Sequence, residues 1–139
     1  MRIIAFDVGE RRIGMAISDS LMLASGIGSY TRRDDSKDFE EIVNVIKEYR
    51  ADKIIVGLPR NMNGTYGPQA EKCRSFGEKL HDLTGIEVIY EDERLTTAAA
   101  QRTLIAAGVS RGKRKQIVDE LAARMILQSY LDRTAKQER

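Results

Sequence analysis

The hydrophobic period of this sequence changes at about residue 31, and the change limits the folds that the chain can adopt. Before that point the apolar residues follow strand patterns: a continuous run at 3–8, an alternating segment at 13–18, and a third segment at 21–30. The joins between these segments are short, which favours antiparallel pairing of neighbouring strands. The first segments are therefore expected to form a three-stranded antiparallel meander.

After residue 31, segments with helical spacing alternate with short buried strands. Helices are expected from about residue 35 onward and over 68–85, where proline opens the second helix and glycine closes it. The strand segments between and after them are KIIVG (53–57) and IEVIY (86–90). A strand–helix–strand–helix–strand series implies parallel strands joined by right-handed crossovers.

The last part of the chain adds two more expected helices. One lies at about 96–108, between a threonine cap and Gly108, and the other runs from about Lys115 to about Arg133. Residues 133–139 are expected to fray. The fold class is therefore α/β: a five-stranded mixed sheet flanked by about four helices, in a single domain that spans 1–139.

Carboxylates occur where the predicted strands end. Asp7 ends the first buried strand, the acids Glu91, Asp92 and Glu93 follow the fifth, and Asp119 lies on the last helix beside small alanines. Functional groups in such sheets collect beyond the carboxyl ends of the parallel strands. Acids from distant parts of the chain are therefore expected to converge at one edge.

Three converging carboxylates predict binding of Mg²⁺ or Mn²⁺, as one ion or two, because these cations prefer hard oxygen ligands and offset the repulsion between acids. Such an ion supports phosphodiester cleavage by activating water. His81 is the only histidine, which argues against zinc and against a histidine base. Plainer interpretations stay open: Asp7 as part of a turn, Glu91–Glu93 as a solvated loop, and Asp119 as a partner of Lys115.

Composition excludes several classes of protein. The 139 residues carry a net charge of only +2, so a nucleic-acid surface would have to come from local clustering of basic residues. Cys73 is the only cysteine; it excludes an internal disulfide, fits a helix core position, and points to the cytosol. No apolar run approaches the roughly 18 residues of a membrane span.

Basic and glycine-rich segments lie beside each proposed acid, as expected if a polyanion is drawn to the site. The loop GLPRNMNGTYGPQAEK (57–72) precedes a helix N-terminus, which favours anions, although a flexible turn is the alternative. Tyr30, Tyr66 and Tyr90 are the aromatic residues near enough to stack on a base. The expected substrate contacts are Arg11, Arg12, Arg60, Asn61, Gly64, Arg94, Arg111, Lys113, Arg114 and Lys115.

The chain contains four ordered segments that resemble the signature blocks of the YqgF family, also called RuvX-like: FDVGERRIGMAISD, GLPRNMNGTYGPQAEK, YEDERLTT and DELAARMILQSYL. The resemblance covers about residues 2–132. It implies a ribonuclease H-like fold related to the Holliday-junction resolvase RuvC. It also implies a cytoplasmic nuclease that matures the 5′ end of pre-16S ribosomal RNA, although the family was first described as Holliday-junction resolvases.

The resemblance places catalytic and metal-ligating acids at Asp7, Glu93 and Asp119, with Asp92 as the neighbour of Glu93. It thereby selects among the three acids at 91–93, which spacing alone leaves open. The chain departs from the family pattern at Glu10, where lysine is common, but the next two residues are arginines.

The favoured function is therefore a metal-dependent nuclease acting on structured RNA, with ribosomal particles as possible partners and no membrane. A four-way DNA junction is the rival substrate; symmetric resolution needs a homodimer, whereas an RNA-trimming enzyme can be a monomer. Two other classes stay open. One is an actin-like nucleotide-binding module, suggested by DVGERRIG, and the other is a non-catalytic RNA- or ribosome-binding protein.

Overall fold

The computed structural model describes residues 1–20, 22–61, 63–93, 108 and 110–137; of residues 93, 111–116 and 136–137 it describes only the backbone. The helix expected at 96–108 lies outside the described residues. The elements are β1 (Ile3–Val8), β2 (Arg12–Ser18), β3 (Ser25–Thr31), α1 (Asp35–Glu48), β4 (Lys53–Pro59), α2 (Pro68–Thr84), β5 (Glu87–Glu93) and α4 (Arg111–Gln137).

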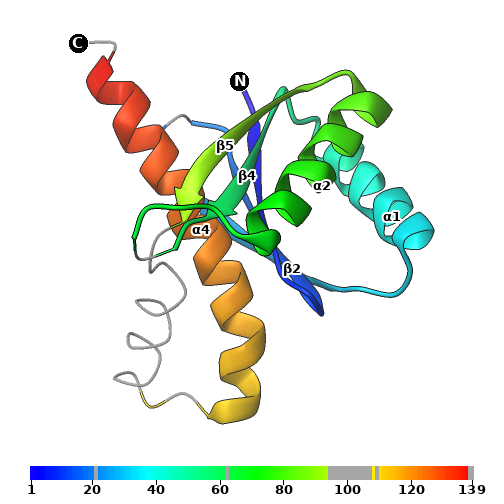
Figure 1. Ribbon diagram of the computed structural model, residues 1–139. Helices are drawn as coiled ribbons and strands as arrows, with labels where there is room; N and C mark the ends of the chain where they lie inside the picture. The colour runs from blue at the N-terminus through cyan, green and yellow to red at the C-terminus, as the bar shows by residue number, and fades with distance from the viewer. Residues whose placement is uncertain (21, 62, 94–107, 109, 138–139) are drawn as a thin grey trace.

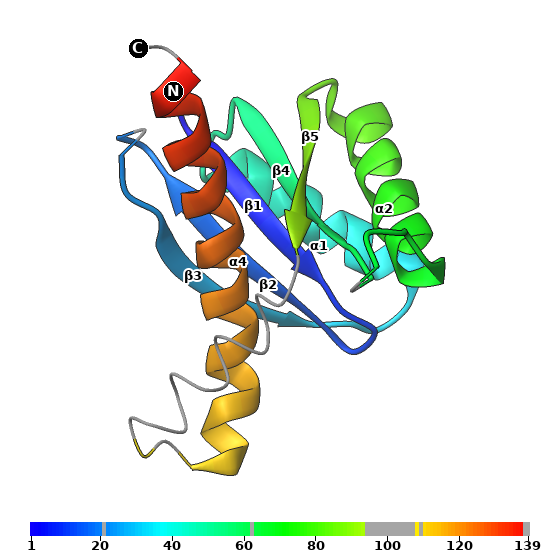
Figure 2. The ribbon, with the colours of Figure 1, turned by 60° about the vertical axis from the view of Figure 1, so that its left-hand side comes forward.

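The five strands form one mixed sheet in the order β3-β2-β1-β4-β5. β1 pairs with β2 and β2 with β3 in antiparallel fashion, whereas β4 runs parallel to both β1 and β5. Helices α1 and α2 lie on one face of the sheet and α4 crosses the other (Figures 1 and 2). The predicted meander and the two parallel crossovers are confirmed.

Local signals set the ends of α1 and α2. The Asp34 carboxylate caps α1 by accepting a hydrogen bond from the Lys37 amide at 2.9 Å. Proline opens α2, as predicted, and Gly85 ends it in the left-handed conformation with φ 72°. The Gly85 amide then donates to the carbonyl of His81 at 2.7 Å.

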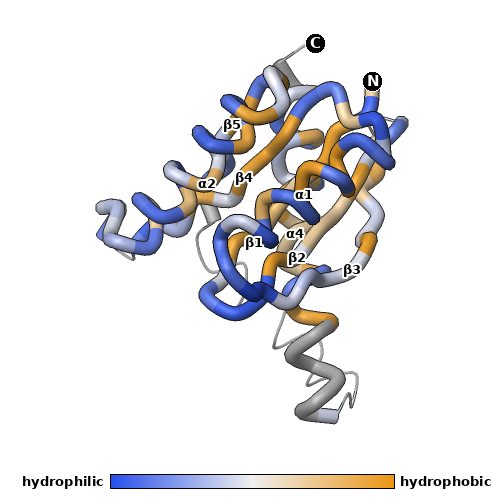
Figure 3. The backbone as a smooth tube through the Cα atoms, turned by 90° about the vertical axis from the view of Figure 1, so that its right-hand side faces the viewer, coloured by the Kyte–Doolittle hydropathy of each residue, from blue (hydrophilic) through white to orange (hydrophobic). Residues whose placement is uncertain are grey.

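The sheet separates two hydrophobic layers. Alternation along β1 sends Ile4 and Phe6 into the layer under α1 and α2, and sends Ile3 and Ala5 into the layer under α4. Figure 3 shows hydrophobic central strands beside helices that alternate in hydropathy. Cys73 is buried in the first layer, which confirms its predicted core position. Within the described residues, no helix is long and apolar enough to cross a membrane.

Helix α4 is longer at both ends than the sequence predicts. It begins at Arg111 rather than Lys115, so the basic segment forms its first turns although positive charge opposes the dipole there. It continues to Gln137 rather than fraying from Arg133. A buried apolar face between Val118 and Leu131 holds the helix on the sheet, and Arg133 pairs with Glu91 at 2.6 Å.

Candidate active site

Asp7, Gly14 and Ser29 form a row across three neighbouring strands. Asp7 is the register partner of Gly14, and Gly14 is the partner of Ser29. Alternation along β1 places Asp7 on the face that α4 covers, two residues after the buried Ala5. Asp7 therefore lies at the carboxyl end of β1 and beside the α4 contact.

Helix α4 packs closely against the sheet at this row. A Cβ atom on Gly14 would overlap the backbone carbonyl of Asp119, so only glycine permits this contact. The small residues Ala122 and Ala123 are fully buried one turn further along α4. Close packing on small residues thus brings Asp119 over the strand position next to Asp7, although 112 positions separate the two acids in the sequence.

The Asp119 carboxylate is held by side chains from β2 and β3. Its Oδ2 atom accepts a hydrogen bond from Arg12 Nε at 2.5 Å and another from Ser29 Oγ at 3.4 Å. Both members of the Arg12–Asp119 ion pair are mostly buried, with side-chain exposures of 29% and 19%. The sequence predicted that Arg12 binds the substrate phosphate. In the structure Arg12 instead pairs with Asp119, one of the predicted site acids. Sequence spacing gave no signal for Ser29.

The three acids at the end of β5 have different surroundings. Glu91 is 6% exposed and accepts hydrogen bonds from Arg133 Nη2 at 2.6 Å and Ser129 Oγ at 3.3 Å. The hydrogen bond to Glu91 raises the pKa of Arg133 above its usual range and outweighs burial, which lowers it. Asp92 is bound by the loop before α2: Arg60 donates to it at 3.1 Å and Tyr66 at 2.8 Å. Glu91 and Asp92 are therefore committed to structural contacts.

Glu93 is the third acid, and its backbone ends β5 opposite Pro59 at the carboxyl edge. Its side chain is not described, and no group of three metal-binding side chains occurs among those that are. The donor chemistry nevertheless fits a hard cation, because Asp7, Asp119 and Glu93 offer only carboxylate oxygens at one edge of the sheet. These residues would hold Mg²⁺ or Mn²⁺.

The other predicted substrate contacts differ in their surroundings. Arg60, Asn61 and Gly64 close their own loop: Arg60 Nε donates to the Gly64 carbonyl at 2.7 Å, and Asn61 Nδ2 donates to Thr65 Oγ1 at 3.1 Å. Gly64 has a φ of 86°, which favours glycine. Arg11 is exposed on the β1–β2 turn. The side chains of Arg94, Arg111, Lys113, Arg114 and Lys115 lie outside the described part.

A buried charged cluster that the sequence did not indicate supports the β1–β2 turn. Asp38 is 1% exposed and accepts hydrogen bonds from Tyr30 Oη at 2.9 Å, Arg32 Nε at 3.1 Å and the Arg33 amide at 2.8 Å. Burial disfavours the Asp38 anion, but these three donors outweigh it and lower the pKa of Asp38. Arg32 also donates to the Gly9 carbonyl at 3.0 Å, which ties the turn to α1.

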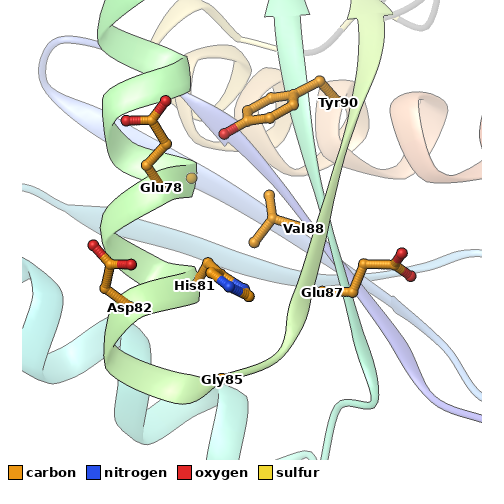
Figure 4. A pocket seen from close by; sticks show the side chains of 8 residues that line it. Glu78, His81, Asp82, Gly85, Glu87, Val88 and Tyr90 are labelled. Atoms are coloured by element: carbon orange, nitrogen blue, oxygen red, sulfur yellow. The ribbon is translucent and has the colours of Figure 1, made fainter.

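A groove between α2 and β5 lies away from these acids. It has a volume of about 570 Å³ and contains Glu78, His81 and Asp82 from α2 and Glu87 and Tyr90 from β5 (Figure 4). Glu87 begins β5 whereas Glu93 ends it, so the groove is not part of the candidate site.

Comparison with solved structures identifies the fold class. RuvC of Thermus thermophilus, solved in complex with a Holliday-junction substrate, superposes with a TM-score of 0.57 at 13% identity over 96% of each chain. The fowlpox virus Holliday-junction resolvase superposes with a TM-score of 0.59 at 15% identity, over 96% of this chain and 99% of that one. The fold is therefore ribonuclease H-like, as the resemblance implied.

Comparison of sequences gives the family. The model of the RuvX family, described as a Holliday junction resolvase, matches residues 1–133. A Heliobacterium modesticaldum protein is 51% identical over 97% of this chain and 91% of its own length, and a Streptococcus uberis protein is 49% identical over 96% and 99%. Both are named as candidate pre-16S rRNA nucleases. The chain belongs to the RuvX family, which confirms the resemblance to YqgF proteins.

Proposed function

We propose that this protein is a Mg²⁺- or Mn²⁺-dependent nuclease that hydrolyses phosphodiester bonds at the 5′ end of pre-16S ribosomal RNA. The observation that carries the proposal is the seating of Asp119 over Gly14, beside Asp7. Asp7 is the register partner of Gly14, and this row lies at the carboxyl end of β1, the edge where open α/β sheets bind ligands. The names of the relatives supply the substrate class.

Each residue of the site has a proposed role. Asp7, Glu93 and Asp119 are the metal ligands, and a bound divalent cation would activate water and stabilise the leaving oxygen. Arg12 and Ser29 orient Asp119 through its Oδ2 atom, which leaves Oδ1 for the ligand role. Arg11, Arg94 and the basic residues 111–115 attract and hold the RNA backbone.

The experiment compares the wild type with Asp7→Asn, Glu93→Gln and Asp119→Asn on a precursor 16S RNA fragment, with Mg²⁺ and with EDTA. Each substitution is expected to lower cleavage by more than about 100-fold while RNA binding persists, because chelation is lost but phosphate contacts remain. Glu91→Gln and Asp82→Asn are matched controls at acids outside the proposed ligand set, and they should cleave normally. Equal cleavage by all the variants would contradict the proposal.

A second candidate function is resolution of four-way DNA junctions, which the description of the family favours. It uses the same acids but requires two of these sites in one dimer. The two functions are separated by testing a mobile junction beside the RNA fragment and by measuring the mass of the protein in solution. Preferential cleavage of the RNA fragment by a monomer supports rRNA processing, which would place the protein in the cytoplasm with ribosomal precursors.

A further inference from the structure

Tyr66 is an exposed aromatic residue at the carboxyl edge of the sheet, the edge where the candidate site also lies. Its side chain is 39% exposed on the loop between β4 and α2, and its hydroxyl donates to Asp92 at 2.8 Å. This hydrogen bond raises the pKa of Tyr66 and holds its hydroxyl against the Asp92 carboxylate. Asp92 directly precedes Glu93, so the ring lies at the carboxyl edge of β5.

Two arginines accompany the ring. The guanidinium carbons of Arg60 and Arg74 lie 5.3 and 5.0 Å from its centroid, within the range of cation–π contacts. Arg60 comes from the same loop and also pairs with Asp92, whereas Arg74 comes from α2 and pairs with Glu71 at 2.6 Å. An exposed ring with cations beside it is the combination that single-stranded nucleic acids contact through bases and phosphates.

The other two tyrosines named as stacking candidates are used inside the protein. The Tyr30 hydroxyl donates to the buried Asp38 carboxylate. Tyr90 packs against Gly77 of α2, where an added Cβ would overlap its hydroxyl, and it donates to the Arg74 carbonyl at 3.0 Å. Among these three tyrosines, only Tyr66 is exposed at the carboxyl edge of the sheet.

We propose that Tyr66 is a stacking platform for an unpaired nucleobase next to the cleaved phosphodiester, and that Arg60 and Arg74 contact the flanking phosphates. A stacked base would displace one guanidinium from the ring, and that guanidinium would then contact the neighbouring phosphate. The inference rests on the proposed function and adds a substrate feature: the site takes a strand that is locally single-stranded.

The absence of tryptophan in the chain permits a direct test. Tyr66→Trp places a single fluorescent indole at the platform, and Tyr49→Trp places one at the end of α1, near Arg2 and the opposite edge of the sheet. In EDTA, so that no strand is cut, single-stranded RNA should quench the Tyr66→Trp emission and leave Tyr49→Trp unchanged. Duplex RNA of the same length should quench neither.

A second measurement separates the ring from its hydroxyl. Tyr66→Phe should bind single-stranded RNA within about twofold of the wild type in fluorescence anisotropy, whereas Tyr66→Ala should bind about tenfold more weakly. Single-stranded DNA is titrated in parallel with RNA. The nucleic acid that quenches Tyr66→Trp at the lower concentration is the preferred strand type. No quenching of Tyr66→Trp, or equal quenching by duplex RNA, would overturn the platform. Because this readout needs no cleavage, it can fail or succeed independently of the Asp119→Asn test.

Discussion

At the scale of single residues, the chemistry of the site depends on which partner each acid has. Glu91 and Asp92 are neighbours in sequence, but one pairs with α4 and the other with the loop before α2. Alternation along β5 causes this division, because successive side chains point to opposite faces of a sheet. Asp119 pairs with Arg12, so a cation already sits at the proposed ligand before any metal binds.

The Arg12–Asp119 pair makes metal binding testable without a substrate. Arg12→Met removes the cation and leaves the Asp119 carboxylate in place, so it should lower the free energy of unfolding by about 1 kcal/mol for this mostly buried pair. Mg²⁺ or Mn²⁺ should then raise the melting temperature of the variant more than that of the wild type, because the metal replaces the lost charge. The measurement is thermal unfolding at increasing metal concentration.

The control for this prediction is the double variant Arg12→Met with Asp119→Asn. It lacks both the cation and the proposed ligand, so it should show little metal-dependent stabilisation. A melting temperature of Arg12→Met that does not respond to metal would contradict a ligand role for Asp119.

At the scale of elements, the position of α4 on the sheet creates the site. The helix contacts all five strands and rests on β2 at Gly14 and on β3 near Gly26. These two glycines differ in what lies above them: the backbone of Asp119 over Gly14, and the flexible end of Glu120 over Gly26. A side chain at position 14 would force the helix backbone to move, whereas a side chain at position 26 would only displace the Glu120 side chain.

Gly14→Ala should therefore lower stability by about 2–3 kcal/mol and displace Asp119, because the added methyl overlaps a helix backbone. Gly26→Ala, the matched control on the next strand, should cost less, since the Glu120 side chain can rotate away. Chemical denaturation gives the stability, and metal-dependent cleavage reports the position of Asp119. Equal effects of the two substitutions would show that α4 is not fixed by Gly14.

At the scale of the whole molecule, buried charge makes stability depend on pH. Asp38 joins α1, the end of β3 and, through Arg32, the β1–β2 turn that carries the basic residues near Asp7. Its pKa is lower in the folded state than in the unfolded chain, so the folded protein binds this proton less readily. The stabilisation is present above about pH 4 and is lost as the pH falls through the lower, folded pKa.

Asp38→Asn should lower the free energy of unfolding by about 2–3 kcal/mol at pH 7, because Arg32 and Tyr30 lose a buried anion. The difference between variant and wild type should shrink as the pH falls below about 4 toward the lowered pKa of Asp38 in the folded protein. Urea denaturation between pH 2.5 and 7 measures both effects; these pH values bracket the ordinary carboxyl pKa. Asp35→Asn, at an exposed acid on the same helix, is the control and should leave the acid dependence unchanged.

The sequence by itself determined the strands, their directions and the first two helices, because these follow from local periodicity, caps and short connections; the roles of Asp7 and Asp119 stay predictions. The start of α4 at Arg111 was missed because tertiary packing overrode the unfavourable charge of its first turn. Only the tertiary structure decided that Arg12 pairs with Asp119 and that Asp38 is buried. It also decided that Glu91 contacts α4 whereas Asp92 contacts the loop before α2. These outcomes depend on contacts between side chains that the folded sheet brings together, and local sequence pattern carries no information about such contacts.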